Sequence, residues 1–104
     1  MKLIAIGTIS FLAFFALASA GVPEGKATVA AKCQSCHGAN GEGKPAIAKM
    51  FNVTIHAFGS KEVQSKSDAD IKKIILSGQG KMKPIAVSDS EAADVVAFIR
   101  TLKQ

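Results

Sequence analysis

The stretch that decides the fold is Cys33-Gln34-Ser35-Cys36-His37, "CQSCH", which holds the only two cysteines of this 104-residue sequence. The two thiols are three positions apart, about one helical turn, and the histidine follows directly. A redox disulfide, a metal site and the covalent attachment of haem can all use such a cysteine pair. The rest of the sequence decides between them.

A redox dithiol and a zinc site are both disfavoured. A thioredoxin-like dithiol needs a βαβ context in which the pair follows a strand, whereas here the pair ends a predicted helix and no strand precedes it. A structural zinc site needs four ligands, usually as two separated pairs. The sequence has no second cysteine pair, and its only histidine outside the motif is His56.

Covalent haem fits the motif best. C-x-x-C-H is the attachment signature of c-type haem, in which two thiols bond to the porphyrin edge and the adjacent histidine reaches the iron. We therefore predict that Cys33 and Cys36 form the two thioether bonds and that His37 is one axial ligand. A large apolar ligand would also supply the core that so short a chain, with no Trp or Tyr, lacks.

The first twenty residues predict export. Lys2 is a short basic start, residues 3–17 are apolar, and Ala18-Ser19-Ala20 is a small-x-small cleavage signal. We expect residues 1–20 to be a secretory signal peptide and residues 21–104 to form one mature domain, with an uncleaved membrane anchor as the alternative. The expected location is the periplasm or an equivalent compartment such as a thylakoid lumen.

The hydrophobic pattern of the mature chain predicts an all-α fold with three main helices over residues 24–32, 68–77 and about 89–102. Ser67 and Ser88 are expected N-caps, Ser88 within a capping box, and Gly78 is expected to stop the second helix. Residues 46–51 could form a short helical turn, and residues 52–65 are expected to be a loop. Loops this long in so small a domain usually carry function.

Charge argues against nucleic acid as a partner. The chain has a formal net charge of +5 and remains positive without Lys2, but its lysines alternate with acidic residues, and no aromatic side chains lie among them to stack on bases. Five lysines flank the haem motif or a later Gly/Pro-rich loop: Lys32, Lys44, Lys49, Lys81 and Lys83. We expect these five to surround an exposed haem edge and to steer the protein toward acidic surfaces on redox partners.

With these features the whole mature chain resembles the small soluble class I cytochromes c. The matching features are Gly25 eight positions before Cys33, the "CQSCHG" motif, Pro45 in a Gly-rich loop, Met82 and Pro84 after a helix that ends at Gly78, and Phe98 in the terminal helix "VVAFIRTLK". The resemblance implies a cytochrome c fold wrapped around one haem c and its iron, with the first and last helices crossing near Gly25 and Phe98. Two positions depart from the family pattern: Val29 replaces a common aromatic, and Lys83 separates Met82 from Pro84.

The second axial ligand of the iron decides the function. Met82 is the preferred candidate because it follows His37 at a long distance in a Gly- and Pro-containing loop, where a methionine has little reason to pack in a core. Met50 and His56 are weaker candidates, since Met50 lies close to His37 with apolar neighbours that suggest ordinary packing. Pro45 resembles the family proline whose carbonyl accepts a hydrogen bond from the axial histidine ring.

A His/Met-ligated haem implies a monomeric one-electron carrier between redox proteins and not an enzyme, because the thioether favours reduced iron and blocks substrate access. Such a carrier would meet a membrane only transiently, through complexes with its partners. The alternative is a haem enzyme or sensor with an open or exchangeable axial site. A haem subunit of a larger oxidoreductase is a third, less favoured possibility.

Overall fold

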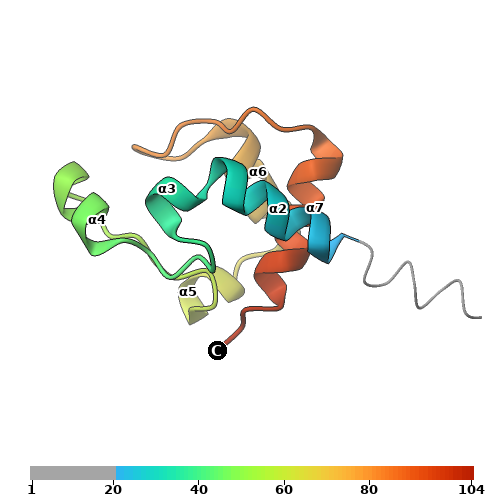
Figure 1. The fold of residues 1–104 in the computed structure, drawn as a ribbon, viewed down its shortest axis with the longest axis horizontal. Coiled ribbons are helices and arrows are strands. Elements are labelled where there is room, and N and C mark those ends of the chain that lie inside the picture. Colours follow the sequence, from blue (N-terminus) through green and yellow to red (C-terminus); the bar gives the residue numbers. More distant parts are fainter. Residues whose placement is uncertain (1–20) are drawn as a thin grey trace, which may run out of the picture.

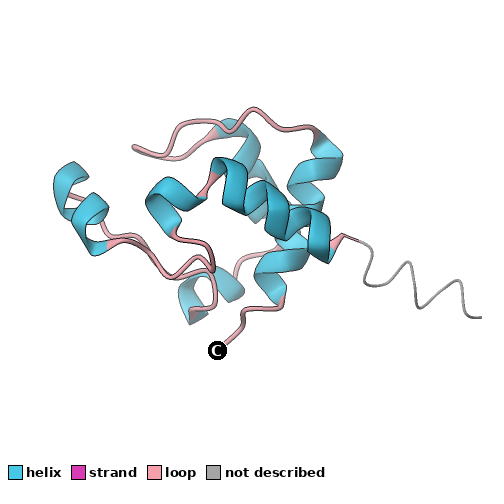
Figure 2. Cartoon of the chain, viewed as in Figure 1, coloured by secondary structure: helices cyan, strands magenta, loops and turns pink. Residues whose placement is uncertain are grey.

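The computed structural model describes residues 21–104, so the predicted signal peptide lies outside the described part of the chain. Figure 1 shows the arrangement of the helices, which are α2 Val22–Lys32, α3 Gln34–His37, α4 Pro45–Phe51, α5 Lys61–Gln64, α6 Asp68–Ser77 and α7 Asp89–Arg100. Residues 21–104 contain no strand, only an isolated bridge between Gln79 and Met82 (Figure 2). The predicted all-α fold with three main helices is confirmed.

The first and last helices pack against each other at Gly25, as the family resemblance implies. A Cβ atom built at Gly25 would overlap the carbonyl oxygen of Asp94 and would lie 3.0 Å from Cβ of Phe98. Only glycine allows the two backbones to approach so closely. Val29, one turn further along α2, is completely buried beside α7, so the smaller side chain at this position still fills the contact.

The core lies where α2, α6 and α7 meet. Its α7 residues follow the predicted apolar stripe, and α6 contributes Ile71 and Ile75. Within residues 21–104, the buried hydrophobic residues are Val29, Cys33, Phe58, Ile71, Ile75, Ala92, Val95, Val96, Phe98 and Ile99. Cys33, from the haem motif, is therefore built into the same core that holds the long helices together.

The predicted helix signals act as expected. The Ser67 hydroxyl accepts a hydrogen bond from the Asp70 N–H, and Ser88 forms a complete capping box with Glu91. Gly78, with a φ of 79°, ends α6. One expectation was wrong: residues 61–64, expected to lie in a loop, form the short helix α5, which Ser60 caps by accepting from the Val63 N–H.

Helix α4 stands apart from the long helices. Figure 1 places it at the opposite side of the molecule from α7. The exposed large hydrophobic residues of the described chain lie in or just after this helix: Met50, Phe51 and Val53 are 70%, 44% and 37% exposed. The core of the three long helices thus leaves this apolar segment without partners.

Candidate functional site

The haem motif lies at the junction of α2 and α3. Cys33 N–H still bonds to the Val29 carbonyl of α2 at 2.9 Å, and the Cys33 carbonyl accepts the His37 N–H at 3.0 Å. Cys33 therefore ends one helix and caps the next, and its φ of −121° produces the change of direction. This local geometry brings both cysteines and His37 onto one short turn.

Both cysteines are free thiols and do not form a disulfide with each other. Cys33 is buried, whereas Cys36 is half-buried. Burial raises the pKa of the Cys33 thiol above its ordinary value, which keeps this thiol protonated at neutral pH. The pair remains available for bonds to another group.

The imidazole of His37 is half-buried and has a polar atom without a partner. Among the buried side-chain nitrogen and oxygen atoms of the described chain, only Nδ1 of His37 makes no hydrogen bond. Burial lowers the pKa of His37 below its ordinary value, which favours the neutral ring. Neutral imidazole is the form that binds metals.

The Gly-rich loop after the motif folds back onto His37. Gly43 N–H donates to the His37 carbonyl at 2.7 Å, and Gly41 N–H donates to the Gly38 carbonyl at 3.0 Å. Three glycines in this loop have positive φ values, a conformation that other residues rarely adopt. The backbone of His37 is therefore hydrogen-bonded to Cys33 before it and to Gly43 after it.

Met82 lies in a tight turn between α6 and α7. Met82 and Gln79 exchange two backbone hydrogen bonds, each 2.9 Å long. The Ile85 N–H then bonds to the Ile75 carbonyl of α6 at 2.9 Å, which ties the following segment back to that helix. Met82 is half-buried, and its turn has a defined shape.

Two lysines connect this segment to the rest of the molecule. The Lys32 ammonium donates to the Ala86 carbonyl at 2.7 Å. The Lys81 ammonium, directly before Met82, donates to the Phe51 carbonyl at the end of α4 at 2.6 Å. The methionine loop is therefore linked both to α2 and to the isolated helix α4.

Three further residues named from the sequence are Pro45, Met50 and His56. Pro45 begins α4, and its hydrogen bond with the ring of His37 in the haem-loaded protein stays a prediction. Met50, expected to pack, is largely exposed. His56 is exposed, as expected.

Sequence reasoning missed one residue of the site, Phe58. Its ring lies against the imidazole of His37, with the two ring centroids 4.9 Å apart. Phe58 lies in the segment that was expected to be a loop. Its only signal in the sequence is that it is one of three phenylalanines among residues 21–104.

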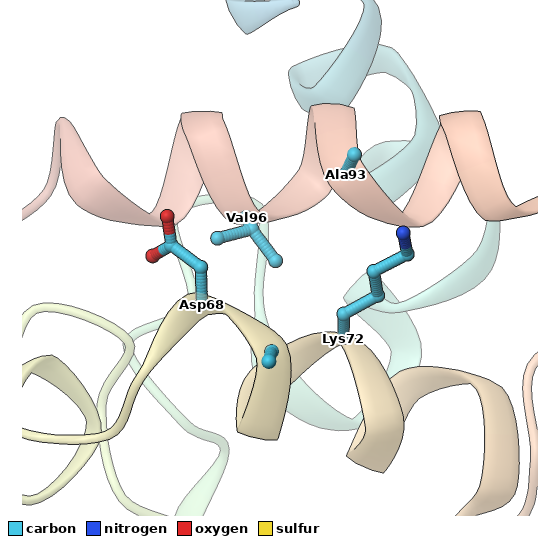
Figure 3. A pocket seen from close by; sticks show the side chains of 5 residues that line it. Asp68, Lys72, Ala93 and Val96 are labelled. Carbon is cyan, nitrogen blue, oxygen red and sulfur yellow. The ribbon is translucent and has the colours of Figure 1, made fainter.

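The hollow between α6 and α7 is separate from these residues. Figure 3 shows Asp68 and Lys72 extending from α6 toward Ala93 and Val96 of α7. Both charged side chains are already paired, Asp68 with Arg100 at 2.7 Å and Lys72 with Asp89 at 2.5 Å. None of the predicted site residues lines this hollow, which we interpret as part of the α6–α7 contact.

The residues around the motif fit a c-type haem. Two free thiols one turn apart match the two thioether bonds, and burial favours the neutral form of the His37 ring, which is the form that binds metals. The unpartnered apolar side chains at the end of α4 suit a large apolar ligand. Among residues 21–104 there is no group of three or more His, Cys, Asp or Glu that could hold a bare metal ion.

Comparison with known families agrees with this assignment. The cytochrome c family model matches residues 22–103, which include all the long helices, the cysteine motif and Met82. A search among curated proteins finds no similar sequence. No helix within residues 21–104 is long and apolar enough to cross a membrane. The chain belongs to the cytochrome c family, and its domain carries covalently bound haem c with iron.

Proposed function

We propose that the protein is an exported one-electron carrier in which Cys33 and Cys36 hold the haem, and His37 and Met82 are the axial ligands of its iron. Membership of the cytochrome c family supports haem-based electron transfer in general. The finer statement rests on the arrangement of this chain's own residues.

The observation that carries the proposal is the pairing of a rigid histidine site with a rigid methionine turn. His37 is held by backbone hydrogen bonds at both its N–H and its carbonyl, and Met82 by the two bonds it exchanges with Gln79. Ligands that are already ordered lose little conformational entropy when they bind iron. Such a site suits electron transfer, which needs little movement of the ligands.

His37 and Met82 have distinct tasks in this proposal. The neutral imidazole, favoured by burial, supplies a nitrogen donor, and the thioether of Met82 supplies a soft donor that raises the reduction potential. With both His37 and Met82 bound to the iron, small molecules would be excluded from it. The haem would supply the redox chemistry, and the chain would supply ligation and shielding from water.

Five exposed lysines support a role in docking to acidic redox partners: Lys32, Lys44, Lys49, Lys81 and Lys83. None of them forms an ion pair among the described residues, so their charges are available to a partner. We propose that they accelerate the encounter more than they tighten the complex.

Export is supported by the composition of residues 1–20, which combine a basic start, an apolar run and a small-x-small end. We propose cleavage after Ala20. Mass spectrometry of the haem-loaded protein from its native compartment should find Gly21 as the first residue; a chain that retains residues 1–20 supports the anchored form.

The proposed ligation is tested by exposing the reduced, haem-loaded protein to carbon monoxide. A His/Met-ligated carrier should keep its visible spectrum, because no axial position is free. A rapid change of the spectrum at neutral pH would contradict the carrier and favour the enzyme or sensor with an open axial site.

A further inference from the structure

The aromatic rings of Phe58 and His37 come from separate segments of the chain and pack against each other at a tilt. Their ring centroids are 4.9 Å apart, and the two ring planes are tilted by 35°. Phe58 is only 8% exposed. The contact is therefore an enclosed aromatic pair at a residue to which we assign an axial bond.

The backbone of Phe58 is fixed by hydrogen bonds on both sides. Its N–H donates to the Gly41 carbonyl at 2.7 Å, and its carbonyl accepts from Nε2 of Gln64 at 2.8 Å. The same amide nitrogen of Gln64 donates to the Ile99 carbonyl of α7 at 3.0 Å. Phe58 is thus connected to the terminal helix and cannot move independently of it.

The loop that follows the haem motif also packs against the Phe58 ring. A Cβ atom built at Gly41 would overlap Cδ2 and Cγ of Phe58, and Gly41 has a φ of 65°. Glycine is required there on both grounds. The phenyl ring therefore contacts the Gly41 backbone as well as the imidazole.

Phe58 supplies an apolar contact to the imidazole ring of His37. Groups that surround a metal-bound histidine set the orientation of its ring. The Phe58 ring, with its centroid 4.9 Å from that of the imidazole, is placed to do this by packing.

We propose that Phe58 is a positioning residue for His37, which restrains the direction of the imidazole plane by packing. This inference rests on the proposed ligation of iron by His37. Rotation of the imidazole about its bond to Cβ would drive its edge into the phenyl ring, so the phenyl ring selects one range of orientations. The chain thereby fixes the direction of the axial ring relative to the porphyrin.

Proton NMR of the ferric, haem-loaded protein tests this directly. The order and spread of the four haem methyl shifts depend on the direction of the axial imidazole plane. Phe58→Leu keeps most of the buried volume but removes the flat ring, and Phe58→Ala removes both. We expect both variants to change the order or narrow the spread of the methyl shifts, with the larger change in Phe58→Ala.

The matched control is Phe98→Leu, a second buried phenylalanine that packs at Gly25 instead of His37. It should lower the midpoint of thermal unfolding and leave the methyl pattern as in the wild type. If Phe58→Leu also lowers only the midpoint, Phe58 is an ordinary core residue and the proposal is wrong. If Phe58→Ala does not load haem, the Phe58→Leu spectrum decides.

His37→Ala separates this proposal from the assignment of the ligand. If His37→Ala leaves the ferric spectrum unchanged, His37 is not an axial ligand, and the proposed function fails together with the role of Phe58. If His37→Ala abolishes the low-spin spectrum while Phe58→Leu leaves the methyl pattern intact, the ligation stands and only the role of Phe58 is contradicted.

Discussion

At the scale of single residues, Gly25 decides how closely α2 and α7 approach. The position of a built Cβ would be 2.6 Å from the Asp94 carbonyl carbon and 3.0 Å from Cβ of Phe98. The first neighbour is helix backbone, which cannot turn aside as a flexible side chain can. A methyl group at this position can be accommodated only if the two helices separate.

Overpacking usually costs about 1–3 kcal/mol, whereas alanine stabilises a helix interior by roughly 1 kcal/mol relative to glycine. Gly25→Ala should therefore destabilise the haem-loaded protein by up to about 2 kcal/mol. Urea unfolding followed by circular dichroism measures the difference. Lys26→Ala, at the neighbouring exposed position, should change the stability by less than about 0.5 kcal/mol; equal effects of the two variants would show that the helices do not meet at Gly25.

At the scale of helices, the start of α7 depends on one ionised side chain. Glu91 accepts the Ser88 N–H through Oε1 at 2.7 Å, and Ser88 accepts the Glu91 N–H at 3.0 Å. The hydrogen bonds with Ser88 hold the pKa of Glu91 below its ordinary value. Because the folded pKa is depressed, this contribution is present above the unfolded-state pKa and is lost as pH falls through the folded-state pKa.

Glu91→Gln should remove this part of the pH dependence, since glutamine can still cap the helix but does not titrate. We expect the wild type to have a larger free energy of unfolding than Glu91→Gln at neutral pH. The two free energies should converge as the pH falls below the ordinary pKa of glutamate. Urea unfolding at a series of pH values gives the difference. A difference that stays constant with pH would contradict the assigned role of the carboxylate.

The helices also show which features the sequence could predict. Ser67, Ser88 and Gly78 act through neighbours within one turn, so their patterns correctly predicted both ends of α6 and the start of α7. Helix α5 was missed because its four residues give no period, and its cap, Ser60, has valine instead of an acid three positions later.

Contacts across the chain were harder to predict than local ones. The C-x-x-C-H motif identified the cofactor, because its meaning depends on spacing alone. The packing of Phe58 on His37 depends on how two loops fold over each other, which no local pattern encodes.

At the scale of the whole molecule, the lysines beside the site should produce an electrostatic effect on rates. Oxidation of the reduced protein by anionic hexacyanoferrate should slow by about tenfold between low and high salt, because salt screens the attraction. The triple variant Lys44→Gln/Lys49→Gln/Lys83→Gln should react more slowly at low salt and depend less on salt. Stopped-flow absorbance measures both effects.

The control for this prediction is Lys73→Gln, which removes an exposed lysine from α6. It should alter the rate much less than any of the three lysines near the site. Equal effects of Lys73→Gln and Lys49→Gln would mean that only the net charge matters and that the lysines near the site form no docking surface.

The central claim, that His37 and Met82 together make an electron carrier, is tested most directly by the reduction potential and spectrum of Met82→Ala. The covalent haem should remain, because Cys33 and Cys36 are untouched. The potential should fall by on the order of 0.1 V, part of the ~0.8 V range that axial ligands cover, the weak red band of thioether–iron bonding should vanish, and the reduced protein should bind carbon monoxide. Met50→Ala, at a side chain that is 70% exposed, should change none of these properties. An unchanged potential and red band in Met82→Ala would contradict the account.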